Sequence, residues 1–301
     1  MVAYNKNVVD KKSISGKEVI SFVDAKESEN IDWETVESFG NEWEKFSHFN
    51  KQEIEDIGNE YFDIVDETML NKNTVALDMG CGTGRWTKYV ASKAKFVEAI
   101  DPSKAVVSAV KLLEDRDNVR ITQADVSNIP FPDESFDFVF SLGVLHHIPD
   151  TKDAMKKTVA KVKPGGHFLV YLYYDLDNKA SYFRLIYGIS NFIRRGICIL
   201  PNGLKRFICD ILAILFYAPM VLLSKAVNAI FGAKWLAYIP LSWYHNKSWK
   251  VIRNDALDRF GTPLEQRFKK EEIKQMMMDC GLTDIKFSNE PPYWHAVGRK
   301  K

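Results

Sequence analysis

The sequence lacks several features that would place it in a special class. Its 41 Lys and Arg residues are balanced by 40 Asp and Glu residues, so it has no basic excess and broad nucleic-acid binding is not expected. Its four cysteines contain no C-x-x-C pair, which predicts reduced thiols, a cytoplasmic protein and no metal site. Residues 1–10 contain no apolar run, so we expect no secretory signal.

What the chain does contain is a strand that ends in an acid and leads into a glycine-rich turn. Residues 75–77 suit a strand that is buried on both faces, and Asp78 ends it. The turn, residues 79–84, is followed by a helix that begins at Arg85. Glycines permit a sharp turn and a close approach to a ligand, and helix-start N–H groups point toward the same place. The pattern predicts a cofactor-binding loop.

The glycine spacing excludes two common cofactor loops. A dinucleotide loop needs G-x-G-x-x-G, but the third glycine counted from Gly80 would fall on Arg85. A phosphate-binding loop needs G-x-x-x-x-G-K-[ST], and Arg85 again replaces a glycine. The observed order, acid-x-G-x-G-x-G, resembles the first motif of class I S-adenosylmethionine-dependent methyltransferases.

Four further motifs follow in the order of that family. The stretch 96–103 is predicted as a second strand that ends in the acid Asp101, and 119–126 as a third strand that carries Asp125. A fourth strand over 135–141 and the turn into a fifth strand, over 162–170, complete the set. Between residues 74 and 172, the chain thus resembles the methyltransferase domain of the ubiquinone and menaquinone biosynthesis type.

The resemblance implies S-adenosylmethionine as the cofactor and assigns residues to it. It gives Asp78 to the ammonium group of the donor, Asp101 to the ribose hydroxyls and Asp125 to the adenine amino group. The full set of implied cofactor-binding residues is Asp78, Gly80, Cys81, Gly82, Thr83, Gly84, Asp101, Pro102, Ala124, Asp125, Val126, Ser141, Leu142 and Gly143.

The alternation of strands and helices predicts an α/β fold with a Rossmann-like sheet and helices on both faces. By the resemblance, seven strands have the order 3-2-1-4-5-7-6, with the last strand antiparallel. We expect a flexible tail over 1–30, a helical cap over 31–73 and the cofactor-binding core over 74–174. A helical insertion, 175–265, follows the fifth strand, and residues 266–301 complete the core with a helix and a hairpin. In the cap, residues 39–43 are either core or a lid over the cofactor.

The insertion is amphipathic and basic. Between residues 182 and 235 it carries seven basic side chains and the single acid Asp210. A spanning helix needs about 20 apolar residues, and Pro219 interrupts a shorter run, so we expect no membrane span. Two readings remain: a lid that covers the substrate pocket, and a surface that contacts an anionic membrane peripherally. The polar segment 253–263 is either a solvated turn or a clamp on the acceptor.

Candidate catalytic residues lie at the carboxyl edge of the predicted sheet, where open α/β sheets bind ligands. His146 and His147 leave the fourth strand there, and an imidazole can accept a proton near neutral pH. Tyr173 and Tyr174 follow the fifth strand at the same edge, and one of them is assigned to the acceptor pocket, with Tyr173 as the candidate catalytic residue. The alternative is that one histidine only orients the loop.

The sequence therefore predicts methyl transfer to an oxygen of a small amphipathic or lipid-linked acceptor, quinone-like or saccharide. Carbon methylation in quinone-type biosynthesis is a second possibility. Two alternatives belong to other classes of protein: a nicotinamide-dependent oxidoreductase, and a non-catalytic adaptor that docks on a membrane. The expected location is the cytoplasm, with the inner face of the membrane as the alternative. The oligomeric state does not follow from these residues.

Overall fold

The computed structural model describes residues 1–24, 28–43 and 51–301, with side chains from 41 to 43 left undescribed. The chain divides into two compact units. The first comprises Met1–Asp175 and Leu264–Lys301, and the second comprises Leu176–Pro263. The second unit occupies the stretch that was expected to be a helical insertion.

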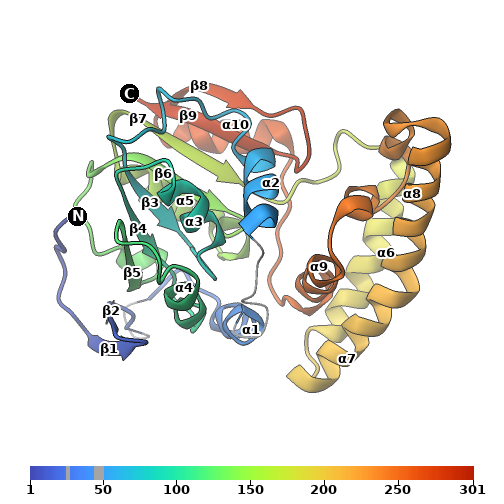
Figure 1. Cartoon of the computed structure of the whole chain (residues 1–301), viewed down its shortest axis with the longest axis horizontal. Helices are drawn as coiled ribbons and strands as arrows, with labels where there is room; N and C mark the ends of the chain where they lie inside the picture. Colours follow the sequence, from blue (N-terminus) through green and yellow to red (C-terminus); the bar gives the residue numbers. More distant parts are fainter. Residues whose placement is uncertain (25–27, 44–50) are drawn as a thin grey trace. The chain divides into compact units, whose positions relative to one another are not determined.

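The first unit is built on a nine-stranded sheet with helices on both faces (Figure 1). The strand order is β1-β2-β5-β4-β3-β6-β7-β9-β8. Strands β2 to β7 run parallel along their pairings, while β9 is antiparallel to both of its neighbours. The strands are β1 (Asp10–Ile14), β2 (Lys17–Ser21), β3 (Val75–Met79), β4 (Phe96–Ile100), β5 (Val119–Gln123), β6 (Phe136–Leu142), β7 (Val162–Tyr171), β8 (Leu282–Phe287) and β9 (His295–Lys300).

The seven strands from β3 onward have the predicted order, which confirms the Rossmann-like fold. The first two strands correct the prediction of a tail over residues 1–30. They form a hairpin, turned at Gly16 with a φ of +79°, that extends the sheet beside β5. Strand β1 is polar and mostly exposed, as edge strands usually are, so it carries no apolar alternation that would mark it as a strand.

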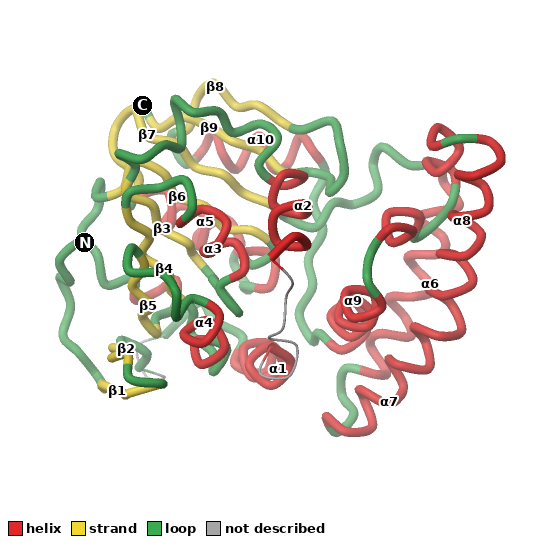
Figure 2. Tube along the Cα trace, in the orientation of Figure 1, coloured by secondary structure: helices red, strands yellow, loops and turns green. Residues whose placement is uncertain are grey.

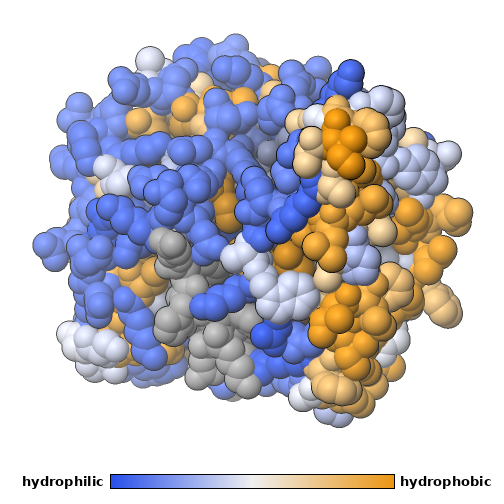
Figure 3. Space-filling model, turned by 45° about the vertical axis from the view of Figure 1, so that its right-hand side comes forward, coloured by the Kyte–Doolittle hydropathy of each residue, from blue (hydrophilic) through white to orange (hydrophobic). Residues whose placement is uncertain are grey.

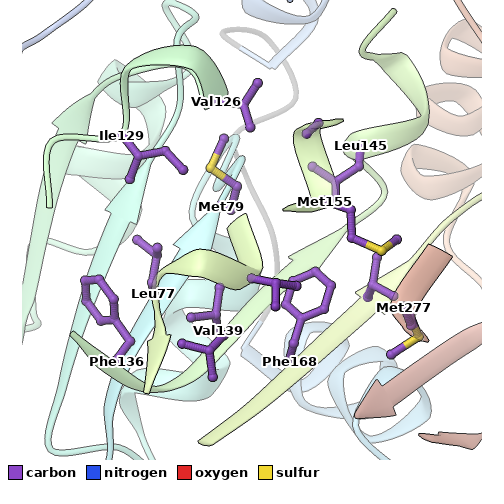
Figure 4. Close-up of a cluster of buried hydrophobic side chains, with 14 of the residues drawn as sticks. Leu77, Met79, Val126, Ile129, Phe136, Val139, Leu145, Met155, Phe168 and Met277 are labelled. Atoms are coloured by element: carbon purple, nitrogen blue, oxygen red, sulfur yellow. The ribbon is translucent and has the colours of Figure 1, made fainter. Parts of the chain in front are cut away.

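The helices of the first unit close the two faces of the sheet. Five of its longer helices are α2 (Lys51–Tyr61), α3 (Arg85–Ala91), α4 (Val106–Leu112), α5 (Thr151–Ala160) and α10 (Lys270–Asp279). Helix α3 contacts α2 and α4, whereas α5 contacts α10. Beneath α5 and α10, the side chains of Leu77, Val139 and Phe168 meet Met155 and Met277 in the main core (Figure 4). This packing fixes β3 and β6, whose ends carry the predicted site.

Two expectations concern the N-terminal cap. Helix α1 (Trp33–Trp43) and α2 occupy the region in which helices were predicted. The proposed lid over residues 39–43 lies in α1, where Phe39 packs against His147 with ring centroids 4.8 Å apart. The other aromatic positions of that pattern, Phe46 and Phe49, lie outside the described residues.

The second unit is entirely helical in its regular structure among its described residues (Figure 2). Both α6 (Ser181–Ile197) and α7 (Asn202–Leu212) pack against α9 (Trp249–Gly261). Helix α7 continues through a π-helical turn, η3 (Ala213–Tyr217), into α8 (Ala218–Phe231), and two 3-10 segments, η4 (Ala233–Tyr238) and η5 (Ser242–Asn246), precede α9.

The continuity of this helix corrects the argument that excluded a membrane span. The helical run from Asn202 to Phe231 has 30 residues, and its length and composition would allow it to cross a membrane. Pro219 does not interrupt it because it occupies the first turn of α8, directly after the π-helical turn. A π-helical turn is a local irregularity of the kind that accommodates a proline within a continuous helix.

Candidate active site

The glycine-rich loop is held against the end of the neighbouring strand. The N–H groups of Gly80 and Cys81 both donate to the carbonyl of Ile100, at 2.8 and 2.9 Å. Gly80 has a φ of +85°, and a Cβ built there would lie 2.4 Å from the side chain of Val144. This glycine is therefore required by backbone conformation and by packing against the loop after β6, in addition to any ligand.

Asp78, at the end of β3, presents a buried carboxylate with one unsatisfied oxygen. Its side chain is fully buried, and its Oδ2 accepts a hydrogen bond from the Thr87 hydroxyl at 2.6 Å. Its Oδ1 has no hydrogen-bond partner among the described residues. Burial, with a smaller contribution from the nearby Asp101, raises the pKa of Asp78 to about 7, although the Thr87 hydrogen bond lowers it. A cationic ligand group at Oδ1 would satisfy this atom and favour its ionised form.

Asp101 connects the glycine loop to the end of β4. Its Oδ2 accepts from the Gly82 N–H at 2.9 Å, and its Oδ1 accepts from the N–H and hydroxyl of Ser103 at 2.9 and 2.6 Å. Burial raises the pKa of this carboxyl, while these hydrogen bonds oppose that rise. A carboxylate has about four acceptor positions, so one position on Oδ2 is still free for a ribose hydroxyl.

Asp125 performs a structural role at the end of β5. Its Oδ1 accepts from the N–H groups of Ser127 and Asn128, which caps a short 3-10 turn, η1 (Val126–Asn128). Its Oδ2 accepts from the Ser28 hydroxyl at 2.7 Å. The assigned adenine contact must therefore share this carboxylate with three protein donors.

The remaining predicted cofactor residues line the same sheet edge. Gly143 has a φ of +77° and its N–H donates to the carbonyl of Tyr171, which turns the chain away from β6. The Ser141 hydroxyl is committed to the carbonyl of Met79. Burial raises the pKa of the Cys81 thiol well above its usual value, so the thiol stays protonated and unreactive. The others that are buried there are Thr83, Ala124, Val126 and Leu142, while Pro102 is half-buried.

The structure brings the three predicted catalytic side chains together. The rings of His146 and Tyr173 stack with centroids 3.9 Å apart, and those of His146 and His147 lie 4.0 Å apart. The ring of Tyr171 is 5.9 Å from that of Tyr173, and it also contacts Tyr61 of α2 at 5.2 Å. The edge of the sheet beyond β6 and β7 is therefore walled by aromatic rings.

The two histidines differ in what holds them. His146 is fully buried, and neither of its ring nitrogens has a partner among the described residues. Burial, assisted by His147 and Arg267, lowers the pKa of His146 well below its usual value, so its ring is neutral at pH 7. In contrast, Nδ1 of His147 lies 2.7 Å from the carbonyl of Leu264. A carbonyl only accepts, so Nδ1 carries the proton and Nε2 presents its lone pair.

Sequence reasoning missed the segment that returns beside these histidines. Gln266 donates its N–H to the carbonyl of His146, and Phe268 donates to that of Tyr173. The guanidinium of Arg267 lies 5.3 Å from the ring of Tyr173, and its Nε donates to Glu265 at 2.9 Å. No local motif marks these residues, because they act on parts of the chain about a hundred positions away.

The polar segment 253–263 is not the solvated turn that was one of its two expected forms. Most of it belongs to α9, so it is a helix and not a turn. Arg259 donates to the Ser190 hydroxyl and lies over the ring of Tyr187, while Asp258 accepts from Thr262. These contacts are within the second unit, and the clamp on the acceptor stays a prediction. Among the described residues, no group of His, Cys, Asp and Glu side chains could hold a metal ion.

Comparisons with known proteins agree with this geometry. Residues 77–170 match the family model described as a methyltransferase domain. A sterol 4-C-methyltransferase of Caenorhabditis elegans is 34% identical over 40% of this chain and 38% of its own length. A ubiquinone biosynthesis O-methyltransferase of Marinobacter nauticus is 28% identical over 48% of this chain and 63% of its own length. The chain thus spans less than two thirds of these relatives.

A solved structure shows the fold over most of the chain. The DhpI complex with SAH matches 89% of this chain and 96% of its own, with a TM-score of 0.52 and 14% identity. The strand order of the sheet and the glycine-rich loop after β3 are those of a Rossmann-like methyltransferase fold. The domain at residues 77–170 belongs to the class I S-adenosylmethionine-dependent methyltransferases. The family implies S-adenosylmethionine as its cofactor.

Proposed function

We propose that this protein transfers a methyl group from S-adenosylmethionine to an oxygen of a small amphipathic or lipid-linked acceptor, quinone-like or saccharide. The observation that carries the proposal is the buried Oδ1 of Asp78, which lacks a partner among the described residues and adjoins the glycine loop. The donor has an ammonium group that fits this atom, and Asp101 retains room for its ribose. When bound, the donor supplies a methyl group that its sulfonium charge has already activated.

The choice of oxygen is supported by His147. Its Nε2 is free to accept a proton, because the carbonyl of Leu264 fixes the hydrogen on Nδ1. A hydroxyl acceptor loses its proton as its oxygen forms the new bond to carbon, and a positioned base assists that loss. His146 is the weaker candidate because its lowered pKa makes it a poor base. We assign it, with Tyr173, to the wall of the acceptor site.

The amphipathic acceptor is supported by the rings at this edge. Tyr61, Tyr171 and Tyr173 offer flat apolar surfaces with polar ends, which suit an aromatic or sugar ring attached to an apolar chain. One relative named above belongs to ubiquinone biosynthesis and the other is a sterol methyltransferase, as their names state, and quinones and sterols are amphipathic. The role of the second unit as a substrate lid stays a prediction.

The test is to incubate the full chain with S-adenosylmethionine labelled in its methyl group and a cell extract of lipids and metabolites. We expect the label in an amphipathic product, attached through oxygen. His147→Gln keeps a donor side chain near Leu264 but removes the base, so it should lower turnover about 100-fold or more and leave donor affinity unchanged. Full turnover in this variant would contradict the role of His147 as the base.

Carbon methylation is the second candidate, favoured by the sterol 4-C-methyltransferase relative. The position of the label in the product distinguishes the two, because an O-methyl group and a C-methyl group differ in chemical shift. If no product gains label while the donor still binds, the methyl-transfer proposal fails and the fold serves binding alone.

A further inference from the structure

The second unit exposes an unusual number of large apolar side chains. Among the described residues, all but four of the exposed large hydrophobic residues of the chain belong to it; the four exceptions are Met1, Val8, Val9 and Met278. In Figure 3, broad apolar areas cover the helices of the second unit on the face that the view shows. Soluble monomers rarely expose a patch of this kind unless it binds something.

The exposed residues repeat with helical spacing, so they form faces and not scattered points. Helix α6 exposes large apolar residues at i, i+3, i+4, i+7, i+10 and i+11. Helix α7 with η3 exposes them at i, i+3, i+7, i+10 and i+11, and Phe216 of η3 is exposed outside this series. We call these two faces together the apolar face. Its residues are Tyr182, Leu185, Ile186, Ile189, Phe192, Ile193, Leu204, Phe207, Ile211, Ile214 and Leu215.

The charge beside the apolar face is almost all positive. On α6, Arg184 and Arg195 are exposed and lie three turns apart, so they share one edge of the helix next to the apolar residues. Lys225 of α8 and Lys234 of η4 are exposed as well. The acid of these helices, Asp210, is paired with Arg253 of α9 at 2.6 Å. Exposed aromatic residues, Trp235 and Tyr238, follow in η4.

We propose that the apolar face lies in the headgroup region of an anionic bilayer, with the helices parallel to the membrane plane. A basic, amphipathic helical surface with exposed Phe, Leu and Trp residues has the composition of interfacial membrane segments. Arg184 and Arg195 would hold anionic headgroups while the apolar residues enter the acyl boundary. The cytoplasmic leaflet carries such lipids, so this places the protein there. The inference goes beyond methyl transfer and does not depend on it.

The packing of α9 argues against a membrane span for residues 202–231. Helix α7 contacts α9 along its length, and Lys205 reaches the carbonyl of Gly261 at 3.2 Å. Helix α9 carries the charged or polar residues Lys250, Arg253, Asn254, Asp255, Asp258 and Arg259. A spanning α7–α8 run would take these groups into hydrocarbon, at a cost of several polar burials. An orientation in the interface keeps them in water.

A second copy of the chain fits the apolar face less well than an anionic bilayer does. The apolar face has basic residues at its edge and its one acid is already paired within the unit, so the face has no charge that complements itself. Two copies placed face to face would each bring positive charge toward the other. An anionic lipid surface complements both the apolar and the basic parts.

The proposal is tested by flotation of the purified full chain with two kinds of vesicle. One contains phosphatidylcholine alone, and the other also contains phosphatidylglycerol. We expect strong flotation with the anionic vesicles, weaker flotation with the neutral ones, and release by alkaline carbonate. Retention after carbonate would instead indicate a span and would overturn the interfacial orientation. A stable dimer that does not float would overturn the proposal in favour of a second copy.

Two variants, each with a matched control, locate the contact. Phe192→Glu with Phe207→Glu places charge on residues that are 79% and 62% exposed, so folding should survive while vesicle affinity falls at least about 100-fold. Met278→Glu, on an exposed residue of the first unit, should change nothing. Arg184→Gln with Arg195→Gln should weaken binding to anionic vesicles roughly 30-fold, whereas Lys274→Gln with Lys286→Gln should not. Unchanged vesicle affinity in both face variants would refute the proposal. Donor binding, measured in parallel, should be normal in all four.

Discussion

The two units of this chain bury opposite kinds of side chain. The first unit encloses large apolar residues and buries four carboxylates in or just after its strands: Asp78, Glu98, Asp101 and Asp125. The second unit buries the cations Arg194 and Lys205 and leaves many of its large apolar residues exposed. Burial of apolar area is the main stabilising contribution to folding. The exposed apolar side chains of the second unit do not make this contribution. An exposed apolar face of that kind is expected where a surface binds another apolar phase.

The buried charges also differ in what they do. In the first unit, Asp78 and Asp101 adjoin the glycine loop, and Asp78 retains an unsatisfied oxygen that suits a ligand. The other two carboxylates are held by protein: Glu98 pairs with Arg120, and Asp125 caps η1. The cations of the second unit are satisfied by protein: Arg194 donates to the carbonyls of Thr262 and Pro263, and Lys205 donates to that of Gly261. These carbonyls are at the C-terminal end of α9, where a positive charge is favourable. The first unit thus has two buried carboxylates placed for binding, whereas the buried cations of the second unit hold its helices together.

The largest predicted effect contrasts a core phenylalanine with an exposed one. Phe168→Ala should lower the free energy of unfolding by about 3–5 kcal/mol, because Phe168 is fully buried against α5 and its removal leaves a cavity. Phe192→Ala should change it by less than about 0.5 kcal/mol in buffer, since the side chain is mostly exposed. Chemical denaturation measures both. Equal losses would show that the apolar face is buried in solution.

The second prediction uses the pKa of Asp78. Folding raises this pKa from 3.8 to about 7, so the folded protein retains a proton that the unfolded chain releases between these values. The free energy of unfolding therefore falls as pH rises from about 4 to about 7, by roughly 4 kcal/mol at most. Asp78→Asn should remove this slope and be the more stable protein at pH 7.

The same variant separates binding from stability. Donor affinity of the native protein should increase as pH rises through about 7, because the ionised carboxylate attracts the ammonium group. Asp78→Asn should bind the donor at least about tenfold more weakly and lose this pH dependence, as isothermal titration calorimetry would show. The exposed Asp117→Asn is the control and should behave like the native protein. A variant that binds the donor normally would remove Asp78 from the site.

The sequence predicts those features of the fold and the candidate site that depend on residues close together in the chain. Asp78 and Gly80 are neighbours in the chain, and parallel strands bring Asp101 to the same edge, so the loop and the sheet order follow from motifs. The tautomer of His147 depends on Leu264, which is 117 positions away, and no local pattern records that contact. The hairpin of β1 and β2 was missed because its polar edge strand lacks alternation. The length of the continuous α7–α8 helix was not predicted because a proline such as Pro219 usually indicates the end of a helix.

The third prediction concerns the buried cations of the second unit. Arg194→Met keeps the apolar stem but leaves the carbonyls of Thr262 and Pro263 without their donor, so it should destabilise the second unit by about 1–3 kcal/mol. The exposed neighbour Arg195→Met should cost less than about 0.5 kcal/mol. Hydrogen exchange resolved by segment would locate the loss in α6 and α9. Loss of protection in β3 and β6 would show that the two units do not unfold separately.

The smallest predicted effect compares two glycines. Gly188 lies inside α6, and a Cβ added there would meet no atom within 4 Å. Gly188→Ala should therefore raise the free energy of unfolding by about 0.5–1 kcal/mol, because alanine loses less backbone entropy in a helix. Gly84 has a φ of +81°, and a Cβ there would lie 2.6 Å from Leu113, so Gly84→Ala should destabilise the protein and weaken donor binding. Thermal denaturation in buffer gives both signs. If Gly188→Ala were destabilising, the position would have to be packed against other atoms and not open to solvent. The second unit would then not expose this part of α6, contrary to the contrast drawn between the two units.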